Sequence, residues 1–163
     1  MAKSMNETKV KMIGEYGLEA ESLIYFNTYY LGENSKGEYS RAIWNFINSI
    51  RNRKKPVIFG DGTHRRGFMY VEDTARAFVL AMKNGTPGEA YNVGTVKSTD
   101  INTIFRTLKE EMGYQCEAYR APNPLKSYQT FTLADIKKAR EELKFVYEYD
   151  LRAGVREMLH NTD

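Results

Sequence analysis

The stretch Arg66-Gly67-Phe68-Met69-Tyr70-Val71-Glu72-Asp73 carries the pattern from which the fold can be inferred. In it an arginine precedes a short alternating run, which leads directly into a segment with apolar residues at helical spacing. Just upstream lies Phe59-Gly60-Asp61-Gly62, a turn whose two glycines allow the backbone to approach a ligand closely. An arginine fork beside backbone N–H groups suits a diphosphate. Taken alone, the same residues could equally form a β-hairpin with a solvated arginine.

The pattern on either side of this stretch predicts alternating strands and helices. Strands are predicted at 22–26, 57–59, 68–70 and 90–93, and helices at 1–16, 42–50, 75–84, 101–112, 136–143 and 150–159. Ser98 or Thr99 is expected to cap the helix over 101–112, and Thr132 with Asp135 has capping-box spacing. Strands separated by helices of ten or more residues indicate the α/β class.

Composition restricts the kind of protein. With 163 residues, 42% of them hydrophobic and 28% charged, the chain has the make-up of a soluble globular domain. No apolar run approaches the roughly 20 residues of a membrane span. Cys116 is the single cysteine, so an internal disulfide is excluded and a reducing, cytoplasmic setting is expected. His64 lacks partners at metal-ligand spacing, so no metal site is predicted.

The net charge of +3 is modest and gathers at residues 51–55 and 64–66. Nucleic acid is one conceivable partner for these basic residues, but no nucleic-acid-binding motif accompanies them. The cluster at 51–55 suits the C-terminal end of a helix, where cations are favourable. An anionic small molecule explains Arg66 better, and neither nucleic acid nor a membrane is predicted as a partner.

Four motifs in order resemble the second half of an extended short-chain dehydrogenase/reductase, the family of nucleotide-sugar epimerases and dehydratases. They are Tyr25-Phe26-Asn27, Gly60-Asp61-Gly62, Arg66 to Asp73, and Tyr91-Asn92-Val93-Gly94. The resemblance implies the C-terminal part of a Rossmann-type fold, mainly its small mixed α/β lobe. Residues 1–30 would then be the tail of the dinucleotide-binding domain, and residues 31–163 the substrate-binding lobe.

Two further segments narrow the subgroup. Glu33-Asn34-Ser35-Lys36-Gly37 and the segment Tyr128 to Asp135 resemble the ADP-glycero-manno-heptose 6-epimerases. Other positions depart from the family pattern: Ile24 replaces an arginine, Gly67 replaces an aspartate, and Glu38 stands where a small hydroxyl residue is usual. A UDP-hexose 4-epimerase or a sugar-nucleotide dehydratase therefore remains an alternative.

The resemblance implies a role for individual residues. Lys36 would be the second acid/base group of an epimerase that removes hydride from a sugar carbon and returns it, and Lys3 would be the lysine of the catalytic Tyr-x-x-x-Lys pair. Lys3 and Thr28 would face the cofactor, NAD or NADP. A nucleotide-diphosphate sugar would be bound by the remaining members of the implied site: Asn27, Asn45, Phe59, Gly60, Asp61, Gly62, Arg66 and Tyr128.

The chain contains neither a GxxGxxG turn nor a tyrosine with a lysine four residues later. We therefore expect a C-terminal piece of a longer enzyme, or a start at an internal methionine, and an isolated chain without catalytic activity. A non-catalytic module that only binds a nucleotide sugar is the alternative from another functional class. The resemblance also suggests a homo-oligomer, while the nucleotide base, the sugar and the choice between NAD and NADP stay open.

Overall fold

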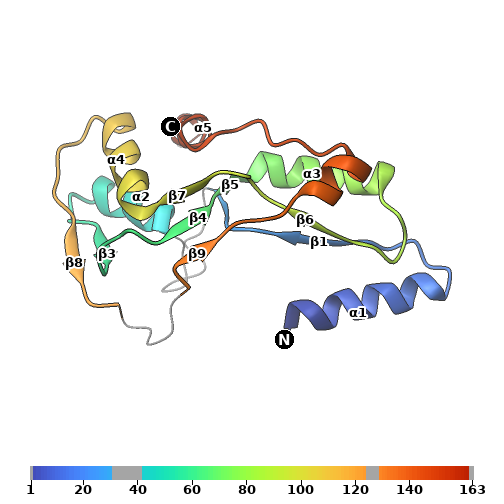
Figure 1. Cartoon of the computed structure of the whole chain (residues 1–163). Coiled ribbons are helices and arrows are strands. Elements are labelled where there is room, and N and C mark those ends of the chain that lie inside the picture. Colours follow the sequence, from blue (N-terminus) through green and yellow to red (C-terminus); the bar gives the residue numbers. More distant parts are fainter. Residues whose placement is uncertain (1, 31–41, 124–128, 162–163) are drawn as a thin grey trace.

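Helices and short strands alternate along an elongated molecule (Figure 1). The computed structural model describes residues 2–30, 42–123 and 129–161, with the backbone alone for residues 2–7. The helices are α1 (Ala2–Glu15), α2 (Ala42–Arg51), α3 (Val71–Asn84), α4 (Ile101–Glu111), α5 (Leu151–His160) and the π-helical η2 (Ala139–Leu143). The strands are β1 (Ser22–Tyr25), β2 (Thr28–Tyr29), β3 (Val57–Phe59), β4 (Arg65–Gly67), β5 (Met69–Tyr70), β6 (Ala90–Val93), β7 (Ser98–Asp100), β8 (Tyr119–Ala121) and β9 (Phe131–Thr132).

Most of the strand pairs are parallel. β1 pairs with β6, β2 with β5, β3 with β8 and β4 with β9 in parallel, whereas β4 and β7 are antiparallel. Parallel strands require long connections, and helices occupy those connections here. α3 lies on one side of the β1–β6 pair and α1 on the other (Figure 1). The expected α/β fold of Rossmann type is thus confirmed.

The hairpin interpretation of the turn at residues 59–62 is wrong. β3 enters the turn and β4 follows it, yet β3 pairs with β8, while β4 lies between β7 and β9. Gly60 and Gly62 both have left-handed backbone, with φ of 66° and 73°, and the chain leaves β3 for a different sheet. The strand predicted at 68–70 corresponds to the shorter β5, and β4, over residues 65–67, is an additional strand that the pattern does not predict.

Two hydrophobic clusters form the core. The first packs α2, α4 and α5 together, and among its fully buried members are Ile43, Ile47, Ile104, Leu108 and Val155. The second lies around α3, β6 and η2, and includes Ala77, Tyr91, Val93, Leu143 and Phe145. The apolar residues of α2 and α4 recur at helical spacing, which is why these helices could be predicted. The division of the chain at residue 30 stays a prediction.

Two predicted helix caps are wrong. Ser98 and Thr99 belong to β7, whose pairing with β4 keeps the backbone extended as far as Asp100. Asp100 caps α4 instead, because its carboxylate accepts the backbone N–H of Thr103 at 2.8 Å. Thr132 does not begin a capping box, since it lies in β9 and pairs with β4.

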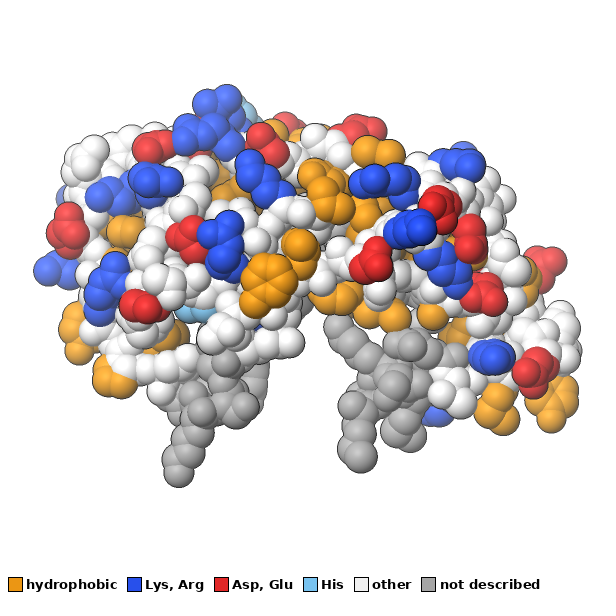
Figure 2. Space-filling model, viewed as in Figure 1, with side chains coloured by type: hydrophobic (Ala, Val, Ile, Leu, Met, Phe, Trp, Pro, Cys, Tyr) orange, Lys and Arg blue, Asp and Glu red, His pale blue; other side chains and the backbone are white. Residues whose placement is uncertain are grey.

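Charged side chains of both signs are mixed on the face shown in Figure 2. This face lacks the uniformly basic character that is typical of nucleic-acid-binding surfaces. In the same view the lower edge of the molecule is hollowed between its left and right parts. Among the described residues, no helix is both long and apolar enough to span a bilayer.

A buried carboxylate ties α3 to the segment that leads into α5. Asp73, in the first turn of α3, is 0% exposed. It accepts the backbone N–H groups of Glu148 at 2.8 Å and Tyr149 at 3.1 Å, and pairs with Arg76 at 3.2 Å. These charge-assisted bonds compensate the cost of burying the charge. Asp73 is therefore a structural residue.

We predict that Asp73→Ala lowers the free energy of unfolding by about 3–5 kcal/mol, because the N–H groups of Glu148 and Tyr149 and the Arg76 guanidinium lose their buried acceptor. Asp135→Ala is the matched control. Its exposed carboxylate accepts one N–H, from Lys137 at 3.0 Å, and we expect a loss of less than about 1 kcal/mol. Urea unfolding measures both variants. Equal losses would show that Asp73 does not hold these segments together.

Candidate functional site

Asn27 stands where the chain leaves β1 and is the first residue of the candidate site. Its φ is 42°, a left-handed conformation that asparagine tolerates better than most residues. The side-chain amide donates to the carbonyl of Gly67 at 3.0 Å and to the hydroxyl of Thr132 at 3.5 Å. Asn27 thus links the carboxyl end of β1 to β4 and β9. In open α/β sheets, ligands bind beyond this end of the parallel strands.

Arg66 reaches the same threonine from β4. Its Nη1 donates to Thr132 Oγ1 at 3.1 Å and its Nη2 to the carbonyl of Gln129 at 2.7 Å. The parallel pairing of β4 with β9 places Arg66 opposite Thr132, so the contact follows from the strand register. The structure therefore brings together two of the predicted residues, Asn27 and Arg66, around one hydroxyl group.

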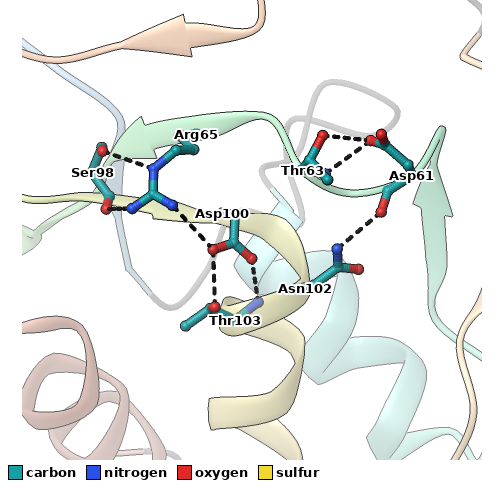
Figure 3. Close-up of polar contacts among 7 residues, drawn as sticks. All are labelled: Asp61, Thr63, Arg65, Ser98, Asp100, Asn102 and Thr103. Carbon is teal, nitrogen blue, oxygen red and sulfur yellow. Dashed lines mark hydrogen bonds and ion pairs between the residues drawn. The ribbon is translucent and has the colours of Figure 1, made fainter.

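Arg65, the neighbour of Arg66 in β4, has its side chain directed to other partners. Its guanidinium donates to the hydroxyl of Ser98 at 3.1 Å and to the Ser98 carbonyl at 2.7 Å, and pairs with Asp100 at 3.5 Å (Figure 3). Successive residues of a strand face opposite sides. Arg65 is consequently committed to β7 and the start of α4, while Arg66 faces Asn27 and Thr132.

Close packing around the site explains why glycine stands at positions 67 and 94. A Cβ on Gly67, the position at which the family has an aspartate, would lie 3.0 Å from Thr95 Oγ1 and 3.3 Å from Leu133. A Cβ on Gly94 would lie 2.8 Å from the Cβ of Ala134. The Tyr91-Asn92-Val93-Gly94 motif thus ends on a glycine because the segment before η2 packs directly against it.

The turn at residues 59–62, together with Thr63, contains a second cluster of hydrogen bonds. The Asp61 carboxylate accepts both the N–H of Thr63 at 3.0 Å and its hydroxyl at 2.8 Å (Figure 3). These hydrogen bonds from Thr63 hold the pKa of Asp61 below its usual value. Phe59 is 45% exposed, and a Cβ on Gly60 would meet nothing within 4 Å. The outer side of the turn is therefore accessible.

His64 joins the turn to β4. Partial burial, followed by repulsion from the Arg66 guanidinium, lowers the pKa of its imidazole. The neutral form is therefore favoured at neutral pH. No group of three or more His, Cys, Asp or Glu side chains in the described part of the chain could hold a metal ion.

The structure does not test the roles of the remaining predicted residues. Asn45 is exposed on α2. Lys3 lies in α1, where only the backbone is described, while Lys36 and Tyr128 lie outside the described residues. Thr28 pairs its hydroxyl with that of Thr74 at 2.9 Å. The implied roles of these five residues stay predictions.

Sequence reasoning missed Thr132 and Gln129 as partners of Arg66. Thr132 was interpreted as a helix cap because the residues after it read as a helix. The signal that could have identified it is the segment from Tyr128 to Asp135, in which the resemblance had already placed a substrate residue.

Comparison with known proteins decides the family. The sequence pattern that defines the NAD dependent epimerase/dehydratase family matches residues 1–94. The chain belongs to this family. The resemblance to nucleotide-sugar epimerases and dehydratases is thereby confirmed.

Three relatives illustrate the match. A Methanocaldococcus jannaschii protein named "Putative UDP-glucose 4-epimerase" is 35% identical over 98% of this chain and 51% of its own length. The crystal structure of UDP-glucose 4-epimerase with UDP-glucose from Thermotoga maritima is 32% identical, with a TM-score of 0.89 over 98% of this chain and 51% of that one. A UDP-N-acetylglucosamine 4-epimerase from Methanobrevibacter ruminantium, in complex with UDP-N-acetylmuramic acid, is 28% identical, with a TM-score of 0.85 over 98% of this chain and 52% of the other.

The family member described here spans about half the length of the curated relatives it matches. The names of all three relatives describe a 4-epimerase of a UDP-sugar.

The family name implies NAD, and the described residues can be tested for a place to hold it. A dinucleotide needs a glycine-rich turn at the start of a helix for its pyrophosphate, and the chain has no GxxGxxG. The hydroxyl of Thr28, the predicted cofactor contact within the described part, is shared with Thr74. These residues do not fit the pyrophosphate of a dinucleotide.

We predict that the Asn27 amide stabilises the site measurably. Asn27→Ala should lower the free energy of unfolding by about 1–3 kcal/mol, because Gly67 and Thr132 lose a donor and alanine is strained at this φ. Asn27→Gly also removes the amide but releases the strain, so it should retain about 1 kcal/mol more stability than the alanine variant. Urea unfolding distinguishes the two. An alanine variant as stable as wild type would show that the amide does not hold β1, β4 and β9 together.

Proposed function

We propose that this chain supplies the substrate-binding part of an NAD-dependent nucleotide-sugar 4-epimerase. The observation that carries the proposal is the meeting of Asn27 and Arg66 at Thr132, just beyond the carboxyl end of β1. The family membership and the UDP-sugar 4-epimerases among the relatives support it. A cytoplasmic setting, expected from the single cysteine, belongs to the same proposal.

The diphosphate of the substrate would lie against Arg66 and Asn27. A guanidinium offers five donors in a planar fork, a geometry that matches phosphate oxygens. Asn27 adds an amide with two donors at the same place. Charge-assisted hydrogen bonds of this kind are the strongest that a protein offers to a phosphate.

The nucleoside would extend along the outer side of the turn at residues 59–62. Phe59, Gly60 and Asp61 are exposed there, and Gly60 leaves room for close approach of a ligand. The Asp61 carboxylate is engaged by Thr63, which limits its repulsion of an anionic substrate. Three residues separate the end of this turn from Arg66, so the two contacts belong to one continuous segment.

The catalytic roles are part of the proposal and rest on the resemblance. Lys36 would act as an acid/base group, Lys3 as the lysine beside the catalytic tyrosine, and Tyr128 and Asn45 as sugar contacts. We expect the isolated chain to bind a nucleotide sugar without epimerising it, because it contains no Tyr-x-x-x-Lys pair.

We predict that Arg66→Ala weakens the binding of UDP-glucose about 10- to 100-fold, because the diphosphate loses a charged fork worth roughly 1.5–3 kcal/mol. Arg65→Ala removes the same charge from the neighbouring residue, whose side chain is committed to Ser98 and Asp100, and should change the affinity less than about threefold. Isothermal titration calorimetry compares the two variants. An Arg66 variant with wild-type affinity, or equal effects of both substitutions, would contradict the assignment of Arg66.

A further inference from the structure

Arg120 reaches the glycine turn from β8. Its Nη1 donates to the carbonyl of Asp61 at 2.7 Å, and its Nη2 donates to the side-chain oxygen of Asn102 at 3.1 Å. The register of β3 and β8 sets this contact, because the adjacent pair Phe59–Ala121 leads into a hydrogen bond from Gly60 N–H to the carbonyl of Ala121 at 2.8 Å. β8 therefore holds the turn through both backbone and side chain.

Asn102 holds the same turn from the first turn of α4. Its amide nitrogen donates to the Asp61 carbonyl at 2.9 Å (Figure 3), and its backbone N–H donates to the carbonyl of Gly62 at 3.3 Å. A Cβ on Gly62 would lie 2.5 Å from Asn102 Oδ1. The fit between the asparagine and the glycine therefore leaves no space for a side chain at residue 62.

These contacts fix the turn from its inner side. The Asp61 carbonyl has two lone pairs, and Arg120 and Asn102 each donate to that oxygen. The guanidinium of Arg120 also donates to the side-chain oxygen of Asn102. Three hydrogen bonds therefore connect Arg120, Asn102 and the Asp61 carbonyl. The outer side of the turn stays exposed at Phe59, Gly60 and Asp61. A backbone segment with this arrangement is held in place for contact with a ligand on the outer side.

We propose that Arg120 and Asn102 are positioning residues for the nucleoside of the substrate, acting through the backbone of the turn at residues 59–62. The inference rests on the proposed function and adds two residues to it. Arg120 is exposed, and hydrogen bonds at the surface add little to stability. Displacing a binding segment by about 1 Å, in contrast, can weaken recognition considerably. Loss of the hydrogen bonds from Arg120 and Asn102 to the turn should therefore weaken ligand binding more than it lowers the stability of the fold.

The test compares two ligands, UDP and inorganic pyrophosphate, by titration calorimetry of the chain and its variants. Both ligands contain the diphosphate, but only UDP reaches the turn. Arg120→Ala and Asn102→Ala should weaken UDP binding about five- to tenfold and leave pyrophosphate binding unchanged. Arg120→Lys keeps the charge without the fork, so it should resemble Arg120→Ala. Arg106→Ala, an exposed arginine of α4, controls for net charge, and thermal unfolding confirms that each variant is folded.

The outcomes separate this inference from the function on which it rests. If Arg66→Ala weakens the binding of both ligands, while Arg120→Ala and Arg106→Ala have the same affinity for UDP, the positioning role is refuted and the diphosphate site is supported. Full recovery of UDP affinity by Arg120→Lys would also refute it, because charge alone would then explain the effect. If the wild-type chain binds neither UDP nor pyrophosphate, the proposed function fails and the inference fails with it. Selective loss of UDP affinity in folded variants of Arg120 and Asn102 would support the inference.

Discussion

The carboxamide of Asn27 is the contact on which the arrangement of the site depends. The residue ends β1 in a left-handed conformation, and its amide bonds the carbonyl of Gly67 and the hydroxyl of Thr132. Three segments separated by tens of residues therefore meet at one side chain. The hydroxyl of Thr132 also accepts from Arg66, so the position of the guanidinium depends on the same junction. A charged fork and an amide donor are placed side by side at a sheet end where ligands commonly bind.

Neighbouring residues in the segment from the turn at residues 59–62 to α3 have different structural roles. The outer side of the turn at residues 59–62 is exposed. Arg65 bonds Ser98 and Asp100, whereas Arg66 bonds Thr132 beside Asn27. Asp73, in the first turn of α3, is buried. Strand alternation separates the two arginines, and the buried carboxylate fixes the helix that follows. This division of roles explains how one short stretch can organise the fold and also present the arginine of the proposed diphosphate site.

The elements that could be predicted from the sequence are those with local signals. Apolar spacing identified α2, α4 and α5, and the start of α5 is capped by Asp150, which accepts the N–H of Ala153 at 2.8 Å. Predictions that depended on strand pairing were wrong. Thr132 has capping-box spacing, but pairing with β4 makes it a strand residue and a partner of Arg66. Pairing of β7 with β4 likewise moved the cap of α4 to Asp100. Arg120 could not be found because its partner, Asp61, lies 59 residues away.

A crystal structure of the chain with UDP-glucose tests the central claim most directly. The account predicts that the diphosphate lies within hydrogen-bonding distance of both the Arg66 guanidinium and the Asn27 amide, with the uridine along the outer side of the turn at residues 59–62. A diphosphate bound elsewhere, out of reach of the Arg66 guanidinium and the Asn27 amide, would contradict it.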